Sequence, residues 1–240
     1  DGSSAVVEVS TALTGTADSV TYELVDAEGQ VLATAEGLGT VQLAANGITP
    51  WTPETPALYT LRVTVTANGT ADTAEQRIGI RTIQVSSKTG LLLNGQPRTM
   101  KGGCIHHDLG ILGSADHAAA ERRRIRLMKE SGFDAIRAAH NPFGPAFLDA
   151  CDELGMLVVE EAFDEWVMGR TSFGLHVTFE QCWEKDLEDM ITRDYNHPCI
   201  VMWSTGNEVE ERDGTADGFA WAKRLADKAR SLDASRPVSA

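Results

Sequence analysis

The stretch Ile200–Glu211, IVMWSTGNEVEE, decides how the second part of the chain is interpreted. Its first residues are apolar and have the length and composition of a strand that is buried within a sheet. The run turns polar at Gly206, Asn207 and Glu208, so that a carboxylate follows directly on the end of the predicted strand. In parallel α/β folds, ligand sites lie at this end of the strands. The stretch therefore predicts a strand of such a fold with a functional group at its carboxyl end.

The same order of apolar strand, polar end and helix recurs on both sides of this stretch. Further short strands are predicted at RTMKGG (98–103), AIRAAH (135–140) and LVVEEAF (157–163), and another begins at PVSA (237–240). Helices are predicted between them at 115–132, 145–155, 178–196 and 216–233. In the third helix, apolar residues at spacings of three and four form one stripe on a polar helix: Phe179, Trp183, Leu187, Met190 and Ile191. This alternation predicts a parallel sheet that is covered by helices.

Two parallel architectures compete, a doubly wound open sheet and a (β/α)8 barrel. The loop after the first strand, GGCIHHDLGILGSAD, lacks the GxGxxG pattern of a nucleotide-binding sheet. Each of the four complete units carries polar side chains at its strand end, which favours the barrel. A barrel needs eight units in about 250 residues, whereas Met100–Ala240 holds four and the start of a fifth strand. The chain is either an open α/β domain or a fragment of a longer protein, and we expect the fragment.

The first part of the chain follows a different pattern. Between Ala5 and about Val85, short runs such as SVTYELVD and LYTLRVTVT alternate apolar and polar residues, as strands with one buried face do. The dipeptide Asn68-Gly69 is typical of a tight hairpin. We predict a multidomain chain, with an all-β immunoglobulin-like sandwich at 1–86 and an α/β domain, the first half of a TIM barrel, at 87–240.

Composition excludes several kinds of partner. The 240 residues include 35 acidic and 21 basic ones, a formal charge of -14, so neither nucleic acid nor an anionic membrane surface is an expected partner. No apolar run approaches the roughly 20 residues of a membrane span. The four cysteines lack CxxC spacing and predict neither a zinc site nor a disulfide framework. The first ten residues lack the pattern of a secretion signal. The location therefore stays open: it is cytoplasmic, or it is periplasmic or secreted if an upstream signal was removed.

Glu208 is the first candidate for chemistry. A carboxylate at the end of a buried strand loses solvation, which raises its pKa and suits a general acid that protonates a leaving oxygen. Asn207 beside it offers an amide that both donates and accepts, as a sugar hydroxyl requires. The alternative is that Glu208 opens a solvated loop together with Glu210 and Glu211.

Two further groups lie at neighbouring strand ends. Arg137 and His140 could orient a carboxylate and tune its charge, or could form a purely structural ion pair. The segment VVEEAFDEW contains four acidic residues beside aromatic ones: Glu160, Glu161, Asp164 and Glu165. Sugar and cation sites both have this composition, although a solvated turn with no functional role explains it equally well.

A metal-dependent hydrolase is a weaker alternative. Its ligands would be His106, His107 and Asp108, together with His140 and Glu161. Adjacent histidines on a strand point to opposite faces, and neither HxH nor HExxH spacing occurs. We therefore predict no metal site.

Several motifs in the same order resemble glycoside hydrolase family 2, the family of bacterial β-galactosidases, β-glucuronidases and β-mannosidases. They are WTPETPALYTLRV (51–63), GIRTIQV (79–85), LLLNGQPRTMKGGCIHHD (91–108), LMKESGFDAIRAAHNPFGPAFLDACDELGMLVVEEAF (127–163) and NHPCIVMWSTGNE (196–208). The resemblance runs from about Trp51 to the end of the chain and looks closest to the β-galactosidase branch.

The resemblance implies roles at single positions. Glu208 corresponds to the proton donor, which later activates water, and Asn207 to the residue that holds the sugar 2-hydroxyl. His106, Arg137 and His140 fall at positions that line the sugar subsite, and we add Asp164 as a further substrate-binding residue. Glu165 matches a position that binds magnesium in some members. Where such a member has a histidine two residues later, this chain has Val167, so no metal cofactor is predicted.

The family's nucleophile is a second glutamate on the seventh barrel strand, which this chain does not reach. Retaining hydrolysis needs two carboxyl groups about 5 to 5.5 Å apart. We therefore expect a longer parent to hydrolyse terminal β-D-galactosides or related β-glycosides, and the chain alone to be inactive. The alternative from another class is a non-catalytic carbohydrate-binding or interaction module. Apart from the carbohydrate, the expected partner is a second copy, bound through the open strand edges of the half barrel.

Overall fold

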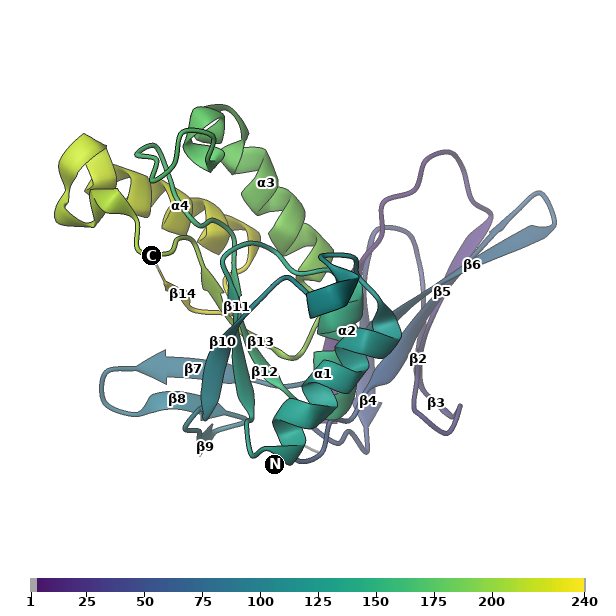
Figure 1. The fold of residues 1–240 in the computed structure, drawn as a ribbon. Coiled ribbons are helices and arrows are strands. Elements are labelled where there is room, and N and C mark those ends of the chain that lie inside the picture. The colour runs from purple at the N-terminus through teal and green to yellow at the C-terminus, as the bar shows by residue number, and fades with distance from the viewer. Residues whose placement is uncertain (1–3, 240) are drawn as a thin grey trace. The chain divides into compact units, whose positions relative to one another are not determined.

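The computed structural model describes residues 4–239 (Figure 1) and divides the chain into two compact units, Asp1–Arg81 and Thr82–Ala240. The sequence analysis set this division at residue 86. Strand β7 (Ile83–Ser86) accounts for the difference, because it pairs with β8 (Gly90–Leu93), which in turn pairs with β9 (Gln96–Pro97). This small antiparallel sheet belongs to the second unit.

The first unit is a sandwich of two antiparallel sheets. One contains β1 (Ser4–Ser10) and β4 (Thr40–Asn46). The other has the order β3-β2-β5-β6, with bounds Val31–Glu36, Ser19–Val25, Tyr59–Ala67 and Thr70–Ile78. Alternate residues of β2, among them Val20, Tyr22 and Leu24, pack against Leu43 and Ala45 of β4, so both sheets contribute to one core. The predicted immunoglobulin-like sandwich is confirmed.

The β5–β6 hairpin turns at the dipeptide that the sequence singled out. Asn68 and Gly69 have φ of 50° and 75°. Both values are positive, as the hairpin turns that match the twist of the strands require. The turn also fixes the register in which Ala67 faces Thr70.

The second unit contains a parallel sheet whose strands follow the order of the chain. They are β10 (Gly102–His106), β11 (Ala135–Ala139), β12 (Leu157–Glu161), β13 (Ile200–Ser204) and β14 (Val238–Ser239). The helices that connect them are α1 (Ala118–Glu130), α2 (Pro145–Leu154), α3 (Phe179–Asp194) and α4 (Gly218–Leu232). Each helix returns the chain to the next parallel strand, which confirms the predicted partial TIM barrel.

Sequence patterns explain the helices that cover this sheet. Helix α2 begins at Pro145, where a missing N–H costs nothing, and ends at Gly155, whose φ is 72°. Four residues of the predicted stripe on α3 are buried, Phe179, Leu187, Met190 and Ile191, and Trp183 is half-buried. Helices α1 and α2 pack side by side, as do α3 and α4 (Figure 1). In the part of the chain that the structure describes, no helix is both long and apolar enough to cross a membrane.

The first barrel strand starts later than the sequence indicated. The pattern predicted it at 98–103, but pairing with β11 begins at Gly102. The preceding segment is held instead by Asp134, which accepts hydrogen bonds from the Lys101 backbone N–H at 2.6 Å and from Arg98 Nη2 at 3.0 Å. Both carboxylate oxygens of Asp134 therefore anchor the entry to the sheet.

Candidate active site

The predicted site residues lie at the carboxyl ends of four neighbouring strands. His106 is the last residue of β10 and pairs in register with Ala139 of β11. Glu161 is the last residue of β12 and pairs with Ser204 of β13. Because the strands are parallel, these ends meet at one edge of the sheet.

Glu161 is the centre of the site. Its side chain is wholly buried, and its Oε2 accepts hydrogen bonds from Arg137 Nη2 at 2.5 Å and from Ser204 Oγ at 2.7 Å. Its Oε1 lies 2.7 Å from His140 Nδ1. Burial alone would lower the pKa of Arg137, but hydrogen bonding and charge from Cys104 and Glu161 raise it overall, so the guanidinium stays charged beside the carboxylate.

From Arg137 the network continues to the residue before Glu208. Arg137 Nη2 donates to Asn207 Oδ1 at 3.0 Å, and Asn207 Nδ2 donates to Asp164 Oδ1 at 2.9 Å. Asp164 also accepts a hydrogen bond from Arg170 at 2.5 Å. The amide of Asn207 is thereby fixed in orientation, because its oxygen faces a cation and its nitrogen faces a carboxylate.

The histidines complete this edge of the sheet. The rings of His106 and His140 meet edge to face, with centroids 5.0 Å apart. His106 is exposed and His140 is partly exposed, so both rings can be reached from solvent. The structure thus brings all five predicted substrate-binding residues into one connected group.

Glu208 differs from its prediction. The sequence indicated a carboxylate that loses solvation at a strand end, but the residue is exposed. Its φ of 43° lies in the left-handed region, which is unfavourable for a residue with a Cβ. This backbone turn carries Glu208 out of the strand direction and into solvent. Arg212 holds the turn by donating to the carbonyl oxygens of Glu208 at 3.2 Å and Val209 at 3.0 Å.

The sequence analysis missed three members of the site. Glu161 appeared there only within an acidic cluster and as a metal ligand, and Ser204 and Arg170 did not appear. Alternation along β12 could have suggested that one of its two glutamates faces the site. The pattern alone does not say which one, because both Glu160 and Glu161 are wholly buried.

Glu160 faces a different environment. Its Oε1 accepts a hydrogen bond from the Phe143 backbone N–H at 3.3 Å, and its Oε2 has no partner among residues 4–239. Burial, and then the charge of Asp194, raise the pKa of Glu160 well above its ordinary range. Burial therefore favours the protonated, neutral form of this side chain.

The residues at the position that resembles a magnesium site do not fit a magnesium ion. Glu165 Oε1 accepts from the His176 backbone N–H at 3.1 Å and lies 3.0 Å from His176 Nδ1, while Oε2 accepts from the Arg170 backbone N–H at 3.0 Å. Burial raises the pKa of Glu165, but these hydrogen bonds lower it overall. Both oxygens thus close the loop between Glu165 and His176, and Val167 offers no ligand.

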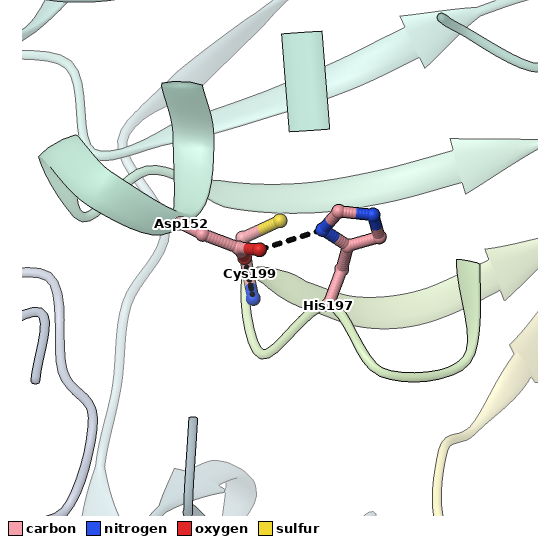
Figure 2. A group of neighbouring side chains, drawn as sticks. All are labelled: Asp152, His197 and Cys199. Atoms are coloured by element: carbon pink, nitrogen blue, oxygen red, sulfur yellow. Dashed lines mark hydrogen bonds and ion pairs between the residues drawn. The ribbon is translucent and has the colours of Figure 1, made fainter. Parts of the chain in front are cut away.

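Potential metal ligands gather elsewhere. Among the residues that the structure describes, one group places three ligand atoms within 4.8 Å of one another: Asp152, His197 and Cys199 (Figure 2). The histidines and acids that the metal-hydrolase alternative required do not form such a group within the same residues. His107, for example, lies against the Ser114 carbonyl oxygen and the ring of Phe143.

The contacts of this group indicate a structural link. Asp152 of α2 lies 2.6 Å from His197 Nδ1 through Oδ2 and accepts from the Cys199 backbone N–H at 3.0 Å through Oδ1 (Figure 2). Burial, followed by the charge of Asp152, raises the pKa of the Cys199 thiol well above its usual range, which disfavours the thiolate that a metal needs. The group therefore fastens α2 to the segment that enters β13.

These features define a class of protein, a TIM-barrel protein with a polar site at its strand ends and an immunoglobulin-like unit before it. The family model for the TIM barrel domain of glycosyl hydrolases family 2 matches residues 83–240, and a second model, for glycosyl hydrolases family 2, matches residues 2–81. The chain belongs to glycosyl hydrolases family 2.

Relatives of two activities are similar to this chain. A beta-galactosidase of Bacteroides ovatus is 38% identical over 235 residues, which cover 90% of this chain and 28% of the relative. A beta-glucuronidase of Paenibacillus borealis is 32% identical over 251 residues, which cover 99% of this chain and 41% of the relative. The chain thus spans less than half the length of either.

Solved structures show the same architecture. A glycosyl hydrolase family 2 member from Bacteroides cellulosilyticus matches with a TM-score of 0.91 and 35% identity, over 99% of this chain and 32% of that one. A β-glucuronidase from Ruminococcus gnavus in complex with D-glucuronic acid matches with a TM-score of 0.86 and 29% identity, over 99% of this chain and 40% of that one.

Proposed function

We propose that this chain is part of a longer retaining β-glycosidase that hydrolyses terminal β-D-galactosides or related β-glycosides, with Glu208 as its general acid and base. The observation that carries the proposal is the hydrogen-bonded group of Glu161, Arg137, Asn207 and Asp164, which includes the residue directly before Glu208. We call the longer protein the parent enzyme.

Asn207 positions the sugar beside the acid. Its amide oxygen already accepts one hydrogen bond from Arg137, and one of its two N–H groups donates to Asp164. One N–H and one lone pair remain for a sugar hydroxyl, which can both accept and donate. Because the amide cannot rotate without losing both neighbours, the hydroxyl is held in one orientation relative to Glu208.

Glu161 keeps the binding residues in place and does not itself react. It is wholly buried, and three side chains contact its two oxygens, so it has no free path to the anomeric carbon. Arg137 Nη1 also donates to Cys104 Sγ at 3.7 Å, so the remaining guanidinium N–H groups and the second ring nitrogen of His140 are left for sugar hydroxyls. The exposed ring of His106 extends the same surface.

Glu208 transfers the proton. In the first half of the reaction it protonates the glycosidic oxygen, and in the second half it takes a proton from water. Retention needs a nucleophilic carboxylate about 5 to 5.5 Å away. We propose that the parent enzyme supplies this group from outside the chain, which leaves the chain inactive on its own.

The test is hydrolysis of aryl β-galactosides, β-glucuronides and β-mannosides by the parent enzyme and by this chain. The Glu208→Gln substitution in the parent should lower kcat/KM by about 10²–10⁴-fold for the sugar that is cleaved. The loss should be largest for poor leaving groups, since these need the proton most. Glu210→Gln, a neighbouring exposed carboxylate, is the matched control and should leave the rate unchanged.

Three results would contradict the proposal. Turnover by the chain itself would mean that its own residues supply both carboxylates. A parent rate that does not respond to Glu208→Gln would remove the acid assignment. Binding of a sugar by the parent without any turnover would favour the non-catalytic module.

A further inference from the structure

Phe143 lies between β11 and α2, in the segment 140–143 that begins with His140. The residue belongs to no helix or strand, yet it is wholly buried. Its backbone N–H donates to Glu160 Oε1 at 3.3 Å, and its carbonyl oxygen accepts from Arg193 Nη2 at 2.6 Å. Buried backbone groups outside regular structure need such partners. Strand β12 and helix α3 thus hold Phe143 at both of its backbone groups.

The ring of Phe143 contacts the chain at the end of β10. It meets the ring of His107 edge to face, with centroids 5.0 Å apart. Arg124 of α1 lies 5.6 Å from the centroid of the Phe143 ring. Its Nη1 donates to the carbonyl oxygens of His106 at 3.1 Å and Asp108 at 2.9 Å. Phe143 therefore touches both the chain that carries His106 and the cation that holds this chain in place.

The connection from Phe143 to His140 is short and stiff. Only Asn141 and Pro142 lie between them. The ring of Pro142 fixes its own φ and restricts the backbone of Asn141 as well. On its other side, His140 joins β11, which is held by its pairing with β10. A shift of Phe143 is therefore transmitted to His140 and is not absorbed between them.

We propose that Phe143 is a positioning residue of the enzyme, which sets how the rings of His106 and His140 lie relative to each other at the sugar site. The inference rests on the function proposed above, in which both histidines line the sugar subsite. Their rings meet edge to face with centroids 5.0 Å apart, so displacing either histidine changes the surface that both present. Phe143 is wholly buried and acts only through these two rings.

Two substitutions separate this role from simple packing. A leucine in place of Phe143 fills most of the buried volume, but it has no aromatic face for His107 or Arg124. A leucine in place of Glu160 stays apolar and buried, and it removes the acceptor of the Phe143 N–H. Glu160→Gln keeps an acceptor and is the conservative variant.

The experiment measures kcat/KM of the parent enzyme on aryl glycosides of the sugar that it cleaves and of the monodeoxy analogues of that sugar. The ratio between the sugar and one analogue reports what the missing hydroxyl contributes. An analogue cannot lose a contact that it does not make, whereas the complete sugar loses this contact when a histidine moves. Alanine variants of His106 and His140 identify the ratio that depends on these rings.

The expected result is a loss of discrimination at one hydroxyl. Phe143→Leu and Glu160→Leu should each lower the ratio that the histidine variants lower, by about threefold to tenfold, the effect of one hydrogen bond. Glu160→Gln should retain the wild-type ratio. A residue with a merely structural role would change the amount of folded enzyme, which affects both substrates equally and leaves the ratio unchanged.

Phe179→Leu is the matched control. Phe179 is equally buried and makes edge-to-face ring contacts, but with Phe163 and Trp221. Its substitution should lower stability without changing any ratio.

Two results would overturn the proposal. One is a wild-type ratio in Glu160→Leu or in folded Phe143→Leu, and the other is an equal change of the ratio in Phe179→Leu. If Phe143→Leu does not fold, Glu160→Leu carries the same measurement. Failure of the underlying function is separate, because it shows as a wild-type parent that cleaves no glycoside or does not respond to Glu208→Gln.

Discussion

Removing the Glu161 carboxylate should destabilise the second unit far more than removing an exposed one. In Glu161→Ala, Arg137 Nη2, Ser204 Oγ and His140 Nδ1 all lose a contact to a buried charged group. Each hydrogen bond to a charged partner contributes about 1.5–3 kcal/mol. The side chains of Arg137 and His140 are 32% and 23% exposed, so water replaces part of what they lose. We expect a net loss of about 3–5 kcal/mol in the free energy of unfolding, the range for breaking a buried ion pair.

Glu161→Gln should cost much less, and the geometry gives the reason. Arg137 and Ser204 both donate to Oε2, so a glutamine whose oxygen takes that position keeps both donors. Its NH₂ then replaces Oε1 and donates to His140 Nδ1, if the imidazole carries its proton on Nε2. What remains is the loss of a charge beside Arg137, for which we expect about 1–2 kcal/mol.

Urea unfolding of the chain, followed by tryptophan fluorescence, measures both variants. The matched control is Glu75→Ala, which removes an exposed carboxylate from its ion pair with Arg62 and should cost at most about 1 kcal/mol. The reasoning is refuted if Glu161→Ala costs no more than this control. It is also refuted if the glutamine variant is as unstable as the alanine variant, because the positions of the donors would then not matter.

Two further predictions concern neighbouring glutamates. Glu208 has a φ of 43°, so its glycine variant should be more stable than its alanine variant by about 1 kcal/mol in urea unfolding. Glu210, which lacks a positive φ, is the control and should show no preference for glycine. Equal stability of the two Glu208 variants would contradict a strained turn. At Glu160, the raised pKa means that the folded state binds more protons than the unfolded one, so its contribution to stability is lost as pH rises above about 4.5. Glu160→Gln keeps an acceptor for the Phe143 N–H, so its stability relative to wild type should increase from pH 4 to pH 8, and a pH-independent difference would argue against a neutral acid at this position.

Much of the fold could be predicted because its signals are local. The period-two alternation of SVTYELVD places Val20, Tyr22 and Leu24 on one face, and the structure buries that face. The strand-end residues Arg137, His140 and Asn207 were found because parallel strands present their carboxyl ends together. The family resemblance then assigned the same positions independently.

The rest depends on geometry that no local pattern carries. Glu160 and Glu161 are adjacent, identical and both buried, and only the pairing of Glu161 with Ser204 in β13 shows which of them faces the site. Glu208 is exposed and has a positive φ, and the sequence TGNEVEE reveals neither property. The late start of β10 likewise depends on Asp134, a residue more than thirty positions away in the chain.

The order of the parallel sheet has a consequence for synthesis on the ribosome. From β11 to β14, every strand pairs with the strand of the parallel sheet that was made just before it, so its partner is already present when it emerges. Contacts between neighbours in sequence form quickly, and domains acquire structure from the N-terminal side during translation. Each βα unit can therefore add to the sheet as it leaves the exit tunnel, so the site at the strand ends is assembled in the order His106, Arg137, Glu161, Asn207.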